Sequence, residues 1–230
     1  MRTVSACLVA CALAAPLLPA ADPGLESDEQ KILYTIGVAL SRSLGNYDLT
    51  PADVAFVQRG LADGVLGRTP EIDLEAFGPR IDDYLAQRKS AAIDKEKEAG
   101  RLFRESVAGE RGAVPLDSGV IYFEQQPGSG AAPQATDTVR VHYRGTLRDG
   151  TLFDTSREEG GEPATFALSG VVPCFSQGIL RMRVGGTSKL VCPPETAYGD
   201  TGFPPLIRPG ATLVFELELL EIQGAPAPAP

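Results

Sequence analysis

The chain has 230 residues, 43% of them hydrophobic and 22% charged, and 30 acidic against 21 basic residues give a net charge of −9. This apolar fraction suffices for a packed core, and the length allows one or two domains. The acidic balance argues against nucleic acid as the main partner, because nucleic-acid binding requires a basic face. A single histidine, His142, and four cysteines without metal-ligand spacing argue against a metal site and against hydrolytic chemistry.

Residues 1–21 have the pattern of a secretory signal peptide, in which one basic residue precedes an apolar run and then small residues. Two prolines interrupt the apolar run, so it would make only a marginal membrane span. We therefore expect this segment to be cleaved. A retained anchor remains an alternative, as does lipid attachment at Cys7 or Cys11.

Two short amphipathic helices are expected next. Ser27 and Gln30 form a capping box for the first, and Thr50 followed by Pro51 is a favoured start for the second. Their apolar faces consist of Ile32, Leu33, Ile36, Leu40 and Leu44 in the first helix and Val54, Val57, Leu61 and Val65 in the second. Two such helices make a thin core, so a second copy of the segment is expected to cover them, which predicts a homodimer.

The short helices also contain glycines that serve either close packing between helices or no special purpose, namely Gly37, Gly60 and Gly64. A third helical stretch begins after Asp73 and runs to about Ala108. Pro79 is expected to kink this stretch or to reset its first turn. Because its second half is rich in charge and poor in apolar residues, we expect a solvated rod that joins two parts of the molecule.

From about Val114 the apolar residues alternate with polar ones, which predicts strands. The expected strands cover residues 120–123, 138–147, 151–154, 164–168, 187–192 and 212–222, and one short helix is expected at 175–181. Gly150 marks a tight turn between two of the strands. The second half is therefore predicted to be an α+β domain, an antiparallel sheet curled over one short helix.

Three segments of this half resemble the FKBP-type peptidyl-prolyl isomerases. The first hairpin of that family resembles VHYRGTLRDGTLFDTS (141–156), its centre resembles VVPCFSQGILRMRVGG (171–186), and its final loop and strand resemble KLVCPPETAYGDTGFPPLIRPGATLVFELELLEI (189–222). The order and spacing match over nearly all of 113–222. With its helical half and signal peptide, the chain is similar to the secreted bacterial subgroup typified by the macrophage infectivity potentiator. In that subgroup N-terminal helices build a homodimer, and a long helix carries each catalytic domain.

The resemblance implies a substrate pocket. Its residues would be Tyr143, Phe153 and Asp154 from the first hairpin, Val171, Val172 and Phe175 in the floor, Tyr198, Phe203 and Ile207 from the long loop, and Phe215 from the last strand. Catalytic roles would fall to Tyr143, Phe153, Asp154 and Tyr198, and the others would bind substrate. The family usually has tryptophan in place of Phe175 and often an aromatic residue in place of Ala164, so a shallower floor and a wider side are expected.

The implied reaction is rotation about an X–Pro amide bond, whose barrier of about 18–20 kcal/mol comes from amide resonance. No covalent bond breaks, so no nucleophile, metal or cofactor is required. An apolar aromatic pocket favours the twisted transition state over the hydrated planar ground state. Tyr198 is expected to donate a hydrogen bond to a substrate carbonyl, whereas Asp154 would orient Tyr143 or interact with the rotating carbonyl. His142 faces away from Tyr143 on its strand and is expected to be non-catalytic.

Cys174 and Cys192 are the cysteines that remain once the signal peptide is removed, and an oxidising compartment permits a bond between them. Cys174 precedes the short helix, and Cys192 lies on the strand that this helix should cover. We expect their separation to suit a disulfide. Two buried thiols are the alternative.

The predicted organisation is therefore a signal peptide (1–21), a helical dimerisation domain with a long linking helix (22–112), an FKBP-type isomerase domain (113–223) and a disordered Pro/Ala tail (224–230). The predicted function is isomerisation of X–Pro bonds in exported proteins, in the periplasm or in association with the outer membrane. Expected partners are proline-containing polypeptides and a second copy of the chain, without nucleic acid, and FK506-type macrolides are further candidate ligands. The alternatives are a dimeric chaperone with weak or no turnover and an envelope scaffold held by an uncut N-terminus.

Overall fold

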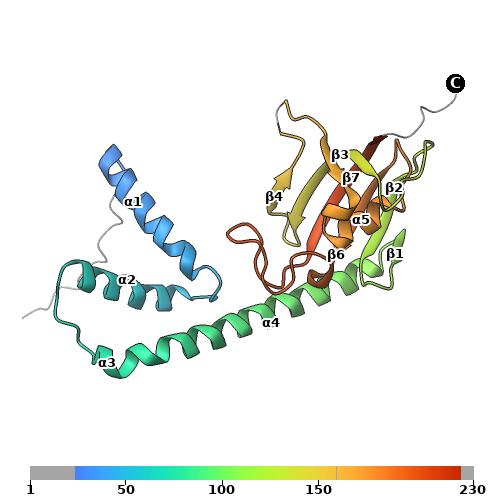
Figure 1. Ribbon diagram of the computed structural model, residues 1–230. Helices are drawn as coiled ribbons and strands as arrows, with labels where there is room; N and C mark the ends of the chain where they lie inside the picture. The colour runs from blue at the N-terminus through green and yellow to red at the C-terminus, as the bar shows by residue number, and fades with distance from the viewer. Residues whose placement is uncertain (1–23, 159, 224–230) are drawn as a thin grey trace, which may run out of the picture. The chain divides into compact units, whose positions relative to one another are not determined.

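The structure is a computed structural model that describes residues 24–158 and 160–223 (Figure 1). The expected signal peptide at 1–21 and the expected tail at 224–230 lie outside the described residues. The chain divides into two compact units, one ending at Ser41 and the other beginning at Arg42. Across the described residues no helix has the length and apolar character needed to cross a membrane.

The first unit contains helix α1 (Asp28–Ser41). Its predicted capping box is confirmed, because the Ser27 N–H donates to Gln30 Oε1 over 2.8 Å and the Gln30 N–H donates to Ser27 Oγ over 3.2 Å. No residue of α1 is buried, although the helix carries Ile32, Leu33, Ile36 and Leu40 of the predicted apolar face; Leu44, predicted on the same helix, lies in the 3₁₀ turn that follows. The cap therefore fixes where this helix starts, and the apolar face remains exposed along it.

The second unit opens with a short 3₁₀ turn η1 (Arg42–Leu44) and helix α2 (Pro51–Val65). Thr50 caps α2 together with Asp53, and Pro51 takes the first helical position as expected. No residue of α2 is buried. The space beside its glycines is open, since a Cβ built at Gly60 or Gly64 has no heavy atom within 4 Å. Within the described chain these glycines therefore make no close helix contact, and the same holds for Gly37.

Pro79 interrupts the third helical stretch in the predicted way. The chain forms a short helix α3 (Leu74–Phe77), a 3₁₀ turn η2 (Gly78–Arg80) and then the 28-residue helix α4 (Ile81–Ala108). The expectation of a fully solvated rod is wrong for the C-terminal end of α4. There Phe103 and Val107 pack against the sheet residues Ile121, Phe123 and Val191.

The second half forms one antiparallel sheet of seven strands, so the predicted α+β class is confirmed (Figure 1). The strands are β1 (Ala113–Pro115), β2 (Ile121–Gln126), β3 (Thr138–Leu147), β4 (Leu152–Thr155), β5 (Ala164–Ala167), β6 (Thr187–Cys192) and β7 (Leu213–Gln223). The order across the sheet is β1-β2-β6-β7-β3-β4, and β5 also pairs with β3. The short edge strand β1 was not expected from the sequence.

Alternating side chains of the central strands serve two different cores. On one face of the sheet, Leu190 and Phe215 belong to the main core, which the short helix α5 (Pro173–Ile179) completes. On the other face, Val191 and Val214 join the cluster around the end of α4. Helix α5 lies very close to β6, because a Cβ at Gly178 would overlap the Leu190 side chain. Two further 3₁₀ turns, η3 (Leu168–Gly170) and η4 (Pro194–Thr196), flank α5 and β6.

Candidate active site

The hairpin of β3 and β4 holds the first polar pair of the candidate site. Tyr143 on β3 and Asp154 on β4 lie near each other because Gly145 pairs with Asp154 and Arg144 with Thr155. The Tyr143 hydroxyl donates to Asp154 Oδ2 over 2.7 Å. Asp154 therefore fixes the direction of the Tyr143 side chain, in line with the positioning role expected for it.

Aromatic rings from four elements meet beside this pair. Phe175 of α5 lies at the centre, with ring centroids 5.5 Å from Phe215, 5.6 Å from Phe166 and 6.1 Å from Tyr143. Phe153 extends the series, because its centroid lies 5.7 Å from that of Phe215. All of these contacts are edge-to-face, the geometry that ring quadrupoles favour. We call Tyr143, Phe153, Phe166, Phe175 and Phe215 the ring cluster.

Phe166 is a member of this cluster that the sequence analysis did not include in the site. Its ring lies 5.7 Å from that of Tyr143 as well as beside Phe175. Position 164, where many family members have a further aromatic residue, is Ala164 on the same strand β5. Strand alternation places residues 164 and 166 on one face, which is the signal that could have identified Phe166.

Gly145 makes room for two rings of the cluster. A Cβ at this position would lie 2.6 Å from Cζ of Phe153 and 3.1 Å from Cε1 of Phe215. The backbone of Gly145 is otherwise part of the regular β3–β7 ladder, where it pairs with Phe215. The glycine is therefore required for close approach of the rings and not for an unusual backbone conformation.

The loop between η4 and β7 carries the remaining predicted residues. Tyr198 packs against the main core, and its ring centroid lies 5.8 Å from that of Phe203. Phe203 is 56% exposed, whereas Ile207 is almost fully buried in the core. The Phe203 N–H donates to the Ile207 carbonyl over 2.8 Å, and the Ile207 N–H returns a bond of 2.9 Å. Tyr198 and Phe203 are thus accessible residues of the loop, while Ile207 supports it.

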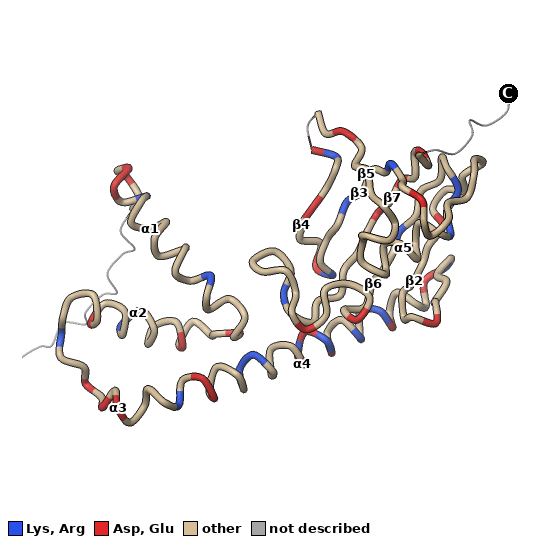
Figure 2. The backbone as a smooth tube through the Cα atoms, in the orientation of Figure 1, with Lys and Arg blue, Asp and Glu red and all other residues tan. Residues whose placement is uncertain are grey.

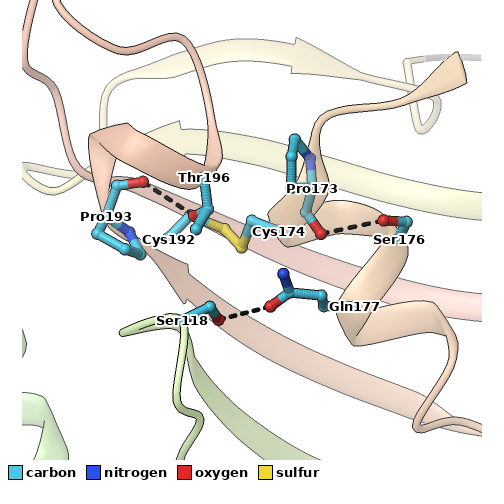
Figure 3. Close-up of a disulfide and its surroundings, with 8 residues drawn as sticks. All are labelled: Ser118, Pro173, Cys174, Ser176, Gln177, Cys192, Pro193 and Thr196. Atoms are coloured by element: carbon cyan, nitrogen blue, oxygen red, sulfur yellow. Dashed lines mark hydrogen bonds between the residues drawn. A yellow bond between two sulfur atoms is a disulfide. The ribbon is translucent and has the colours of Figure 1, made fainter.

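Val171 and Val172 lead into α5 and both pack against the main core. The Val172 carbonyl accepts hydrogen bonds from the N–H groups of Phe175 and Ser176, so Val172 begins the helix that carries Phe175. Cys174, next to Phe175, forms a disulfide with Cys192 at the end of β6, with the Cα atoms 5.8 Å apart (Figure 3). A hydrogen bond of 2.6 Å from Ser118 to Gln177 also holds α5 (Figure 3). The helix that carries the central ring is therefore fixed to the sheet by a covalent bond.

Burial controls the ionisation of the two site tyrosines. Burial is the largest cause that raises the pKa of the Tyr143 hydroxyl, and its hydrogen bond to Asp154 raises that pKa further. Burial also raises the pKa of Tyr198, with a smaller contribution from the negative charge of Asp154. Both side chains therefore keep their protons at neutral pH and can act as hydrogen-bond donors.

The other titratable groups do not converge on the ring cluster. The His142 ring, which was expected to have no catalytic role, contacts Ser156 Oγ through Nδ1 at 3.1 Å. In residues 24–158 and 160–223, no group of three or more His, Cys, Asp or Glu side chains is placed to hold a metal ion. The arrangement is thus an apolar cluster of rings in which Phe175 and Phe215 are buried, while Tyr143, Phe153 and Phe166 are half-buried and offer an apolar contact for an uncharged segment of polypeptide.

Comparison with known proteins gives two family matches. The family described as "FKBP-type peptidyl-prolyl cis-trans isomerase" matches residues 129–220, and the "Domain amino terminal to FKBP-type peptidyl-prolyl isomerase" matches residues 29–123. Together the two matches cover most of the described chain.

The similar proteins include the FKBP-type peptidyl-prolyl cis-trans isomerase FkpA of Escherichia coli K12, which is 36% identical over 97% of this chain and 91% of its own length. The outer membrane protein MIP of Legionella longbeachae is 33% identical over 98% of this chain and 99% of its own length. The crystal structure of FkpA from Escherichia coli matches with a TM-score of 0.62 at 34% identity, over 88% of this chain and 100% of that one.

Proposed function

This chain belongs to the FKBP-type peptidyl-prolyl cis-trans isomerases and has their activity, and we propose that it turns over X–Pro bonds at the ring cluster and the tyrosine hydroxyls beside it. The observation that supports this location is the continuous edge-to-face contact from Phe153 through Phe215 and Phe175 to Tyr143. The chemistry needs nothing more than such a surface, because amide rotation makes and breaks no covalent bond. The binding-only alternative, a chaperone without turnover, is not favoured by the family membership.

The mechanism follows from the loss of amide resonance during rotation. The planar X–Pro amide is polar and well hydrated, whereas the twisted amide has a less polar carbonyl and a partly free nitrogen lone pair. Rings that exclude water therefore bind the twisted state more strongly than the planar state, which lowers the barrier. Phe153, Phe175 and Phe215 supply this apolar surface, and Val171 and Val172 extend it beside α5.

The hydroxyl groups set the direction of the bound peptide. Tyr198 is protonated at neutral pH, as an ordinary tyrosine is, and burial raises its pKa further; we assign to it a hydrogen bond to a substrate carbonyl. Tyr143 already donates to Asp154, so this pair presents a fixed polar edge beside the rings. Phe203, which is exposed next to Tyr198, contacts the part of the substrate that extends beyond the proline, and Ile207 holds the loop that carries both.

The site is tested by a cis/trans isomerisation assay on a short X–Pro peptide. Phe153→Ala is expected to lower kcat/KM about 10- to 100-fold, since removing an aromatic side chain that bound substrate covers costs roughly 1.5–3 kcal/mol of apolar contact. Tyr198→Phe is expected to lower it about 2- to 10-fold, the value of one net hydrogen bond. Leu152→Ala is the matched control, because Leu152 neighbours Phe153 on β4 and is exposed. If all three variants turn over like the wild type, the site lies elsewhere.

We also propose that the protein acts as a homodimer formed through its N-terminal helices. The apolar faces of α1 and α2 support this, since neither helix has a buried residue in the single chain. The match of residues 29–123 to the domain amino-terminal to FKBP-type isomerases is consistent with a separate role for this region. The domain division at residue 112 is part of the same proposal.

Export and ligand range complete the proposal. The signal-like pattern of residues 1–21 supports export to the periplasm, where proline-containing polypeptides would be the clients. The similar protein from Legionella longbeachae is named an outer membrane protein, so association with that membrane is included. FK506-type macrolides are proposed to bind the ring cluster and to compete with peptide in the assay above.

A further inference from the structure

Helix α4 contacts the catalytic half through a face with apolar residues near its C-terminal end, Phe103 and Val107, and with a stretch before them that carries charged side chains. Residues of this face recur every three or four positions and lie toward the domain, whereas Arg101 pairs only along the helix, with Glu98 and Glu105. Acidic and basic residues alternate along α4 (Figure 2). The residues on the domain side are Ile93, Glu96, Lys97, Gly100 and Arg104.

Both ends of the loop that carries Tyr198 and Phe203 lie against this face. At the start of the loop, Lys97 Nζ forms an ion pair with Asp200 Oδ1 at 2.6 Å, and this bond raises the pKa of Lys97. At its end, a Cβ built at Gly210 would lie 3.1 Å from the Ile93 carbonyl oxygen and 3.2 Å from Lys97 Cγ. The two ends are joined to each other, because the Gly210 N–H donates to the Gly199 carbonyl over 2.9 Å.

The base of the same loop is anchored further along the helix, by Arg104. Thr212, which is fully buried, accepts a hydrogen bond of 2.7 Å from Arg104 Nη1. Gly100 permits this approach, since a Cβ there would overlap the Thr212 hydroxyl. Thr212, which directly precedes β7 and lies three residues before Phe215, is therefore held against the helix.

The hairpin turn before Phe153 has its own contact with α4. Arg148 donates to Glu96 through Nε at 3.0 Å and through Nη2 at 3.3 Å, a two-point contact that sets the orientation of the guanidinium. The Glu96 side chain is only 16% exposed, so this pair is better shielded than an ordinary surface pair. Arg148 lies five residues before Phe153 and six before Asp154.

We propose that Glu96 and Lys97 are positioning residues for the isomerase reaction, which hold the turn before Phe153 and the loop after Tyr198 in the arrangement that receives the substrate. This inference rests on the proposed location of the site. Neither residue touches the ring cluster, so their contribution acts through Arg148 and Asp200. Each of the two segments adjoins a residue of the proposed site, Phe153 or Tyr198, so substrate binding is expected to depend on where each segment is held. Loss of the two ion pairs is therefore expected to weaken substrate binding more than the rotation step.

The test compares two double variants of the full-length chain. Glu96→Ala with Lys97→Ala removes the two contacts, and Glu98→Ala with Arg101→Ala is the matched control, which removes one acid and one base from the same helix without touching the domain. Alanine preserves the helix in both variants. We expect KM to rise about 3- to 10-fold in the first variant with kcat within about twofold, as for two partly exposed ion pairs, and no change in the control.

Amide hydrogen exchange gives a readout that does not need turnover. Exchange at residues 199–211 should accelerate in the Glu96→Ala, Lys97→Ala variant and not in the control. Lys97→Asp combined with Asp200→Lys should restore the wild-type exchange rates, which a general loss of stability would not allow. If the wild-type protein had no isomerase activity, the proposed function would be wrong. The exchange rates would still test this inference, because they do not require turnover. The inference is overturned if the exchange rates at residues 199–211 are equal in the two double variants, or if kcat falls equally in both.

Discussion

The N-terminal helices and the sheet domain differ in how far their apolar side chains are buried. No residue of α1 or α2 is buried in the single chain, whereas Val139, Leu190 and Leu213 on the sheet are fully buried. Burying apolar surface is the main favourable contribution to folding. The sheet domain therefore contains its own source of stability, whereas α1 and α2 bury little apolar surface in the single chain.

The largest effect is expected from charges on the exposed face of α2. Val57 and Leu61 are 41% and 48% exposed, and Val57→Glu with Leu61→Glu should weaken self-association by a factor of roughly 10² to 10⁴, because about 1.5–3 kcal/mol is lost for each apolar side chain. Analytical ultracentrifugation measures this change. Val114→Glu is the control, since Val114 is 42% exposed but lies on β1 of the sheet domain. A wild-type monomer, or a double variant that stays dimeric, would contradict the proposed role of these helices.

The next effect concerns the covalent bond within the sheet domain. Reduction of the Cys174–Cys192 bond, which closes a segment with a sequence separation of 18, should lower the free energy of unfolding by about 3 kcal/mol. Urea denaturation with and without reductant measures the difference. In the variant with Cys174→Ala and Cys192→Ala, reductant should have no effect. Equal stability of the oxidised and reduced wild type would show that packing alone holds α5.

A smaller effect is expected within the ring cluster. Gly145→Ala places a methyl group against Phe153 and Phe215, and forcing atoms into a filled space costs about 1–3 kcal/mol, so kcat/KM should fall roughly 5- to 100-fold. Gly170→Ala is the matched control, because a Cβ there meets no heavy atom within 4 Å. The isomerase assay compares the two variants. Wild-type activity in Gly145→Ala would mean that the rings of Phe153 and Phe215 are not part of the site.

The smallest effect is the response to pH. The pKa values of Tyr143 and Tyr198 lie above the ordinary value of 10.0, so both hydroxyls stay protonated through neutral and mildly alkaline solution. We expect kcat/KM to be constant between about pH 6 and pH 9 and to fall only above about pH 10, where Tyr198 begins to lose the proton that it donates. In Tyr198→Phe the alkaline fall attributable to this hydroxyl should be absent. A marked change near neutral pH would point to a different titrating group.

The sequence predicted the sheet well where alternation was regular. The expected bounds of β3 and β6, at 138–147 and 187–192, agree with the structure. Helix α5 begins at Pro173, earlier than expected, although proline at the first helical position is a known start signal. The three-residue strand β1 was missed because so short a segment has no period, and its pairing with β2 is decided by the sheet.

The contacts of α4 could not be predicted from periodicity. Its docked face contains Glu96, Lys97 and Arg104, and polar residues at helical spacing also occur on solvated helices. Only the fold brings Arg148 and Asp200, from distant parts of the chain, within reach of them. The family resemblance identified the other members of the ring cluster. Phe166 was left out of the predicted site, because its partners Tyr143 and Phe175 come from other elements.

Gly100 determines how the catalytic domain is oriented on helix α4. Successive residues of an α-helix are turned by about 100° around its axis, so the neighbours of Gly100 point in other directions. Gly100 is therefore the position of α4 that leaves room for the Thr212 side chain. Turning the domain around the helix would bring Ala99 or Arg101 into the place of Gly100, where there is no space for a larger residue. Gly100 therefore fixes the rotation of the domain about the α4 axis. As a result, the proposed site faces a constant direction relative to the last turns of that helix.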